Sequence, residues 1–316
     1  MENQNSTMIS DPRKQQSDAN QEHSLTDNPQ TYSISLCICT MNRADDLDRC
    51  LASVMQSQEP PDEVIVSDDS PDPNPTKAVV ARYREVTYQP GPKRGLGPNR
   101  NACIRSAKSS HLIFIDDDVC VPREFFTEAR KAISSQPESL ITGYEMNHGG
   151  GGRWSGEVRK VVPYNADFWG LQRIPVSEDY RAITINSTIF PQSLFKRALF
   201  DENIRYGFEE LDMAKHAVAL GYKINYCDDL YVNHYPSSVN REHYKQFTHA
   251  SRLYATTKAY LYYDRSWLKA SLFILLAPLK LAVFLVKQGD LWGWWKAIRA
   301  TAIASGYFLR RPTITL

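Results

Sequence analysis

Three consecutive carboxylates, Asp116, Asp117 and Asp118, follow directly after the apolar run 112–115. A short apolar run of this kind predicts a buried strand, so the strand would end in a dense packet of negative charge. Adjacent acids repel one another unless a cation neutralises them, and Mg²⁺ or Mn²⁺ favours carboxylate oxygens. The triplet therefore indicates either a divalent metal site or a solvated acidic turn.

A second acidic strand end favours the metal site. The run 63–67 predicts a strand that is followed by Asp68 and Asp69. Strands are expected at 34–39, 63–67, 86–88 and 112–115, and helices near 47–55, 76–83 and 99–108. Because this alternation predicts a parallel, doubly wound sheet, the two acidic strand ends should lie along one edge, where such folds bind ligands.

A third group of acids, Glu209, Glu210 and Asp212, opens a predicted helix that ends at Gly221. Acids in a first turn are favoured by the helix dipole alone, so the group has a purely structural interpretation. The alternative is a general base, which would need burial or neighbouring negative charge to offset the dipole. Farther along the chain, His234 is a candidate metal ligand for the acidic site.

Composition narrows the classes of partner and compartment. The 316 residues include 37 Lys and Arg against 36 Asp and Glu, so no global charge imbalance points to nucleic acid. Six cysteines without a secretory signal upstream indicate reduced, cytosolic thiols. Residues 1–31 are polar and carry few aliphatic side chains, so we expect a disordered tail.

The C-terminal quarter, residues 241–316, is predicted to be helical and membrane-associated. The stretch 272–286 is strongly apolar but contains Pro278 and Lys280, and 291–311 interleaves tryptophans with cations. This mixture favours helices that lie on, or dip into, the cytoplasmic leaflet, over a true span or a buried core helix. The expected organisation is a tail at 1–31, a domain at 32–240 and this helical region.

Five motifs in order resemble those of the inverting family 2 glycosyltransferases, whose nucleotide-sugar-binding fold is called GT-A. Residues 38–43 resemble the family's "CTYNR" segment, and 66–70 its "VDDGS". Arg100-Asn101 resembles its "RN" helix start, and the Asp triplet falls on its DxD motif. The acids at 209–212 fall on "EDxD", with Glu210 where the family usually has Asp. The resemblance implies an α/β fold with a Rossmann-like mixed, mostly parallel sheet flanked by helices.

The resemblance also implies roles for individual residues. The nucleotide-sugar donor would be held by Thr40, Asn42, Arg43, Asp69, Arg100, Asp116 and Asp117. A divalent metal, Mg²⁺ or Mn²⁺, would be held by Asp116, Asp118 and, as in some members, His234. The base would be Glu210 by motif position, with Glu209 and Asp212 as rivals.

The predicted function is metal-dependent, inverting transfer of a sugar from a nucleoside-diphosphate sugar to an acceptor hydroxyl. The acceptor would be a saccharide or a lipid-linked molecule at the inner face of a membrane, in surface polysaccharide or glycolipid synthesis. One alternative is a GT-A-like domain that has lost activity and serves as a binding or scaffold protein. Another is a sugar-phosphate nucleotidyltransferase, which would carry a glycine-rich loop where this chain has residues 39–43.

Overall fold

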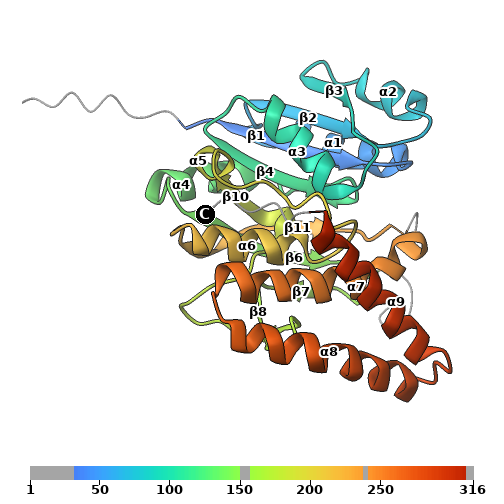
Figure 1. The fold of residues 1–316 in the computed structure, drawn as a ribbon. Helices are drawn as coiled ribbons and strands as arrows, with labels where there is room; N and C mark the ends of the chain where they lie inside the picture. The colour runs from blue at the N-terminus through green and yellow to red at the C-terminus, as the bar shows by residue number, and fades with distance from the viewer. Residues whose placement is uncertain (1–31, 150–156, 238–240, 311–316) are drawn as a thin grey trace, which may run out of the picture. The chain divides into compact units, whose positions relative to one another are not determined.

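The computed structural model describes residues 32–149, 157–237 and 241–310. The predicted tail, residues 1–31, lies outside the described residues. Within them, the central feature is a nine-stranded mixed sheet in the order β3-β2-β1-β4-β10-β6-β11-β5, with β7 paired to β6 (Figure 1). The fold class predicted from the sequence is therefore confirmed.

One half of the sheet is parallel and carries the acidic strand ends. Its strands are β1 (Ile34–Thr40), β2 (Glu63–Asp68), β3 (Val86–Pro90) and β4 (His111–Asp116). The register places Cys39 opposite Asp116 and Thr40 opposite Asp68. The carboxyl ends of β1, β2 and β4 thus meet at one edge, as the alternation of strands and helices predicted.

Helices cover both faces of this sheet because the strands are apolar on both sides. Ile34, Leu36 and Ile38 of β1 join a core shared with one set of helices, whereas Cys37 and Cys39 join a core shared with another. The first set contains α1 (Ala44–Met55), α2 (Asn74–Val80) and α4 (Phe125–Ser135). The second contains α3 (Leu96–Ser106), α5 (Gln192–Phe195) and α6 (Glu209–Ala219).

The other half of the sheet mixes directions. Strand β10 (Thr188–Pro191), which follows the 3₁₀ turn Ile185–Ser187, runs antiparallel to both β4 and β6 (Leu140–Asn147). Strand β11 (Ile224–His234) runs parallel to β6. The remaining short strands are β5 (Val119–Cys120), β7 (Arg159–Val161) and the separate pair β8 (Asn165–Ala166) and β9 (Gln172–Ile174). The pairing of β11 with β6 has a register shift between Tyr226 and Tyr231.

The C-terminal region is helical, as predicted, and has a core of its own. Helix α7 (Arg241–Lys258) continues into a π-helix (Ala259–Tyr263) and is followed by α8 (Trp267–Lys287) and α9 (Gly293–Leu309). Buried side chains of α7, α8 and α9 form a single apolar cluster. Of the described helices, only α8 is long and apolar enough to suit a membrane span, with a mean hydropathy of 2.0. The domain boundary at 240 stays a prediction.

Candidate active site

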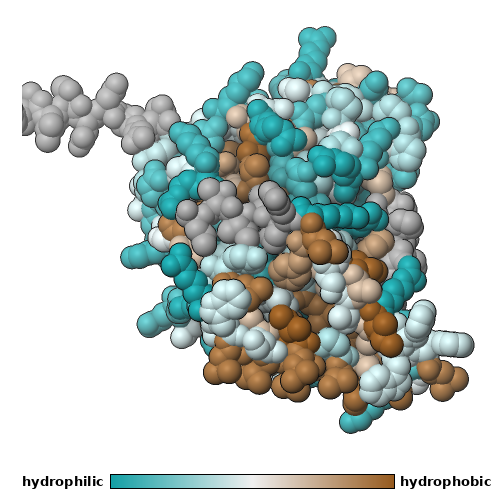
Figure 2. All heavy atoms as spheres, in the orientation of Figure 1, coloured by the Kyte–Doolittle hydropathy of each residue, from teal (hydrophilic) through white to brown (hydrophobic). Residues whose placement is uncertain are grey.

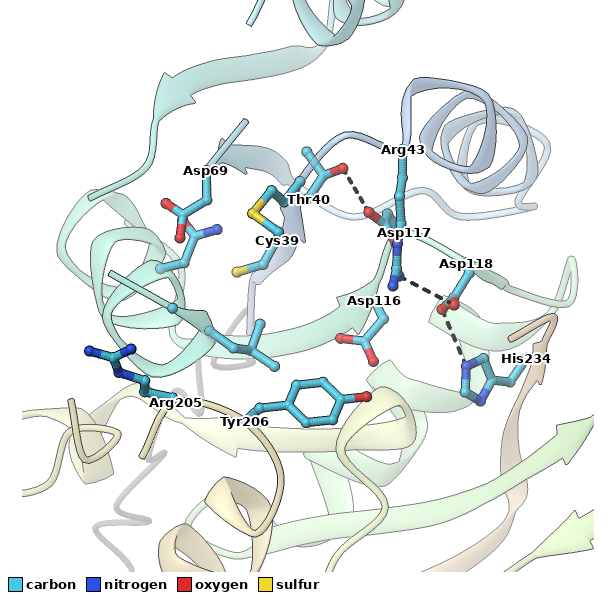
Figure 3. Close-up of a pocket in the computed structure, with 14 residues that line it drawn as sticks. Cys39, Thr40, Arg43, Asp69, Asp116, Asp117, Asp118, Arg205, Tyr206 and His234 are labelled. Carbon is cyan, nitrogen blue, oxygen red and sulfur yellow. Dashed lines mark hydrogen bonds and ion pairs between the residues drawn. The ribbon is translucent and has the colours of Figure 1, made fainter. Parts of the chain in front are cut away.

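A cleft with a volume of about 170 Å³ lies at the carboxyl edge of the parallel strands (Figure 3). Its walls come from the loops after β1, β2 and β4, the start of α3, the loop before α6 and the end of β11. The predicted site residues among its lining are Thr40, Arg43, Asp69, Asp116, Asp117, Asp118 and His234. Most of the residues proposed for donor and metal are therefore gathered in one cavity.

At one end of the cleft, Asp69 is fixed by the loop that follows β3. Its Oδ1 accepts a hydrogen bond of 2.8 Å from the backbone N–H of Lys93, and burial raises the pKa of the carboxyl above its ordinary value. Asn42, which is exposed, links two loops through a 2.8 Å bond from its N–H to Oγ of Ser70. Asn42 and Lys93 both have φ near +60°, a strained conformation for such residues that is common in binding loops.

Asp117 is a buried support inside the cleft wall. Thr40 donates to Asp117 through Oγ1 at 2.7 Å, and Nη1 of Arg43 pairs with it at 3.0 Å. Burial raises the pKa of Asp117 to about 7, although the positive charge of Arg43 acts to lower it. Thr40 and Arg43, two of the residues predicted to hold the nucleotide, thus also hold Asp117, and contact of any of the three with the donor stays a prediction.

The other end of the cleft contains a carboxylate–imidazole–carboxylate chain. Nε2 of His234 lies 3.2 Å from Oδ1 of Asp118, and its Nδ1 lies 3.1 Å from Oε2 of Glu145. Burial acts to lower the pKa of His234, but its bonds to the two carboxylates outweigh burial and raise that pKa to about 10. The second oxygen of Asp118 accepts from the backbone N–H of Ser237 at 2.8 Å.

A divalent metal ion held by Asp118 and His234 stays a prediction. Metal-ligating histidines usually donate one ring N–H to a carboxylate and present the other nitrogen to the metal. Glu145 occupies the first role here, and Asp118 faces the second nitrogen. In the part of the chain that the structure describes, no group of three or more His, Cys, Asp or Glu side chains stands ready to hold an ion. Diphosphate oxygens would have to supply the remaining ligands.

Asp116 links the cleft to the helix that carries the third acidic group. Its backbone N–H donates to Oδ1 of Asn186 at 2.8 Å, and its carboxylate lies 3.3 Å from Nη2 of Arg100. The other guanidinium nitrogen, Nη1, lies 3.3 Å from Oε1 of Glu209. Arg100 is only 2% exposed and does not line the cleft. The structure therefore places Arg100 behind Asp116, and direct contact with the donor stays a prediction.

Helix α6 begins at a strained turn. Gly207 and Phe208 both have positive φ, at 75° and 69°, so the chain reverses sharply before Glu209. Burial, followed by the charge of Glu209, raises the pKa of Glu210 to about 8. Arg100 and Glu145 are near enough to influence the same pKa. Glu210 makes no ion pair with any described residue and is not among the residues that line the cleft, so its role as the base stays a prediction.

The two alternatives to Glu210 as the base, Glu209 and Asp212, each form an ion pair. Glu209 is buried against Arg100. Asp212 is 2% exposed and lies 2.8 Å from the ammonium of Lys258. Both alternatives are thus paired with buried cations, whereas Glu210 is not, and Glu210 as the base stays the prediction that its motif position gives.

Sequence reasoning missed Glu145, which contacts the cleft residue His234, and two residues that line the cleft. Glu145 lies near the end of β6, and its Oε1 accepts a hydrogen bond of 3.0 Å from Nδ2 of Asn186. An acid near a strand end was a usable signal, because it matches the pattern of β2 and β4. Arg205 and Tyr206 also line the cleft, directly before the turn into α6. Their irregular loop gave no periodic signal.

Comparison with known families and proteins gives two matches by sequence. The model of the family described as "Glycosyl transferase family 2" matches residues 35–204, which is more than half of the chain. An uncharacterised protein of Mycobacterium tuberculosis (strain CDC 1551 / Oshkosh) is 30% identical over 107 residues, which are 33% of this chain. The match spans about a third, 34%, of that relative's length.

Solved structures of S. aureus TarS share the fold. TarS 1–349 in complex with UDP-GlcNAc has a TM-score of 0.57 and 16% identity, with 86% of this chain and 81% of that chain covered. The complex of TarS 1–349 with UDP has a TM-score of 0.54 and 16% identity, with 88% and 92% covered. A further TarS structure has a TM-score of 0.52 and 18% identity, with 80% of this chain and 43% of that chain covered. The mixed α/β sheet and its flanking helices are therefore common to both proteins.

Proposed function

The chain belongs to glycosyl transferase family 2, and from this premise we propose that it is a metal-dependent, inverting glycosyltransferase. Its donor would be a UDP-sugar and its acceptor a hydroxyl group. The observation that carries the proposal is the cleft, which brings Asp69, the Asp triplet and His234 together, next to the start of α6.

In the proposed reaction, the acceptor oxygen attacks the anomeric carbon of the sugar from the face opposite the leaving group. The carboxylate of Glu210 takes the proton of the acceptor hydroxyl as the new C–O bond forms. The bond between the anomeric carbon and the phosphate oxygen breaks, and its electron pair leaves with the nucleoside diphosphate. One displacement gives inversion.

The triplet and its neighbours would bind the donor. Asp69 accepts a hydrogen bond from the protein and has oxygen lone pairs left for a ring N–H of the base, which uracil provides. The TarS complexes with UDP and UDP-GlcNAc support a uridine donor. Asp118 and His234, with Asp116 beside them, would hold Mg²⁺ or Mn²⁺. That ion would offset the negative charge that grows on the departing diphosphate.

An exposed apolar surface supports the proposed site of action at a membrane. The exposed apolar side chains of α8 include Leu268, Leu272, Leu275, Leu279 and Val283, which follow one another three or four positions apart along one face. Figure 2 shows hydrophobic residues gathered over α8. Exposed tryptophans of α9 and the turn before it, Trp292, Trp294 and Trp295, continue this surface. A large apolar patch with tryptophans and lysines around it suits a bilayer interface.

We therefore propose that α8 and α9 rest on the cytoplasmic leaflet and that the acceptor is delivered there as a lipid-linked saccharide. In α8 the opposite face, including Ala270, Phe273 and Ala277, is buried within the C-terminal core. A helix that packs against protein along one face and exposes apolar residues along the other is suited to lie in the interface.

Calorimetry tests the proposal. We expect UDP to bind far more tightly with Mn²⁺ than without it, and GDP and CDP to bind weakly. Asp118→Asn should abolish the Mn²⁺-dependent part, and Glu210→Gln should spare binding and lower turnover. Absence of metal-dependent UDP binding would contradict the proposal. Binding without turnover on any acceptor would favour the inactive scaffold, and pyrophosphate release from a nucleoside triphosphate and a sugar phosphate would favour the nucleotidyltransferase.

A further inference from the structure

A buried lysine joins the C-terminal helices to the helix that carries the proposed base. Lys258, the last residue of α7, is 0% exposed. Its ammonium lies 2.7 Å from Oδ2 of Asp201 and 2.8 Å from Oδ2 of Asp212. Asp201 precedes the loop into α6, and Asp212 lies in the first turn of α6. In Figure 1, α7 runs beside α6.

Two tyrosines complete this cluster from the C-terminal side. Tyr254 of α7 donates its hydroxyl to Asp201 at 2.7 Å, and Tyr263 of the π-helix donates to Asp212 at 3.2 Å. The Tyr263 ring also stacks on His216 of α6, with centroids 4.9 Å apart. Short π-helices often occur at functional sites, and this one places Tyr263 against α6.

A buried cluster of three charges is a poor way to gain stability. The desolvation of an ammonium and two carboxylates offsets most of their attraction, and apolar side chains of the same volume often stabilise a fold as well or better. What such a cluster provides is a defined geometry, because a displaced partner would leave an uncompensated buried charge. The cluster therefore restricts how α6 can sit against α7.

The restriction acts on both sides of Glu210. Asp212, which Lys258 holds, lies two residues after it. Phe208, two residues before it, packs against the apolar core of the C-terminal helices. The first turn of α6 is thus fixed to the C-terminal region at both ends, and Glu210 lies between the two attachments.

We propose that Lys258 is a positioning residue for Glu210 and that the C-terminal helices, through Lys258 and Phe208, hold the base in register with the cleft. The inference rests on the proposed role of Glu210 in proton transfer. It assigns Asp212 to an anchor rather than to a base.

The first test replaces Lys258. Lys258→Met keeps most of the side-chain length and removes the charge, so we expect kcat to fall about 100-fold, because a shift of about 1 Å in a reacting group has an effect of this size. The affinity for UDP with Mn²⁺, measured by calorimetry, and the KM for the donor should stay within about twofold of the parent. Lys258→Arg restores the charge and should recover most of the lost kcat. An arginine variant with the turnover of the methionine variant would contradict the proposal.

A matched pair of tyrosine variants separates positioning from stability and remains informative if Lys258→Met does not fold. Tyr263→Phe removes a hydroxyl bond to the carboxylate on α6, whereas Tyr254→Phe removes one to the carboxylate outside α6. Both should lower the melting temperature. Only Tyr263→Phe should lower kcat, by about tenfold. Equal kcat values for the two variants would contradict positioning through α6.

Glu210→Gln distinguishes this inference from the proposed function. If Glu210→Gln loses turnover and a folded Lys258→Met keeps parental kcat, the positioning role is wrong and the base assignment stands. If Glu210→Gln keeps parental kcat, the base assignment itself is wrong, and the positioning role is wrong with it.

Discussion

The raised pKa of Glu210 makes a quantitative prediction for the pH dependence of transfer. With a pKa of about 8, compared with an ordinary value of 4.5, the carboxyl is mostly protonated at neutral pH. The ionised fraction of the base would be about 9% at pH 7, about 50% at pH 8 and about 90% at pH 9. The value of kcat/KM for the acceptor should therefore rise about tenfold from pH 7 to pH 9.

The assay measures initial rates of UDP release with a saturating UDP-sugar and Mn²⁺, so that titration of the donor and metal site does not limit the rate. Glu210→Gln is the control, because it keeps the side-chain shape and removes the titrating group. We expect its residual rate to be about 10²–10⁴-fold lower and to lack the rising limb. A parental profile that is flat between pH 6 and pH 9, or a limb that persists in the variant, would refute the assignment.

The same pKa shift has a signature in stability, and its sign is opposite to that of an ordinary ion-paired acid. Because the folded-state pKa of Glu210 lies above the unfolded value, folding favours the protonated form. This contribution is fully present below about pH 4.5 and is lost as the pH rises through about 8. The melting temperature of Glu210→Gln should therefore equal that of the parent near pH 4 and exceed it increasingly up to about pH 8. A parent that is as stable as the variant at pH 8.5 would show that the carboxyl does not titrate in this range.

Three further perturbations test other parts of the site and surface. His234→Gln should weaken Mn²⁺-dependent UDP binding by at least about tenfold in calorimetry, because it removes a proposed ligand; unchanged Mn²⁺ dependence would exclude this histidine. Gly91→Ala should weaken UDP binding by about 1–3 kcal/mol, because the added Cβ would overlap Oδ1 of Asp69. Parental affinity in a folded variant would show that the Asp69 carboxylate can move without loss of binding. The double variant Leu275→Glu/Leu279→Glu should no longer float with anionic lipid vesicles, whereas its transfer to a soluble acceptor should continue. Flotation equal to that of the parent would refute the membrane-binding surface on α8.

Local patterns in the sequence predicted the parallel half of the fold and the cleft. Strands β1, β2 and β4 are short apolar runs that end in polar residues, and parallel strands bring such ends to one edge. The direction of β10 and the register shift within β11 were not accessible in the same way. They depend on pairing between segments far apart in the chain, which no local periodicity encodes.

The acids at the start of α6 show where sequence reasoning about a site stops. Glu209 and Asp212 are three positions apart, which puts them on one face of a helix, and that face is the buried one, with exposed fractions of 5% and 2%. Two buried carboxylates need cations, and the fold supplies them from opposite directions in the chain: Arg100 from α3 and Lys258 from α7. Neither partner is detectable from spacing, since each contact spans tens of residues. Once both pairs are known, Glu210 is the acid that no described cation neutralises, so the partners of its neighbours, more than the motif itself, favour it as the base.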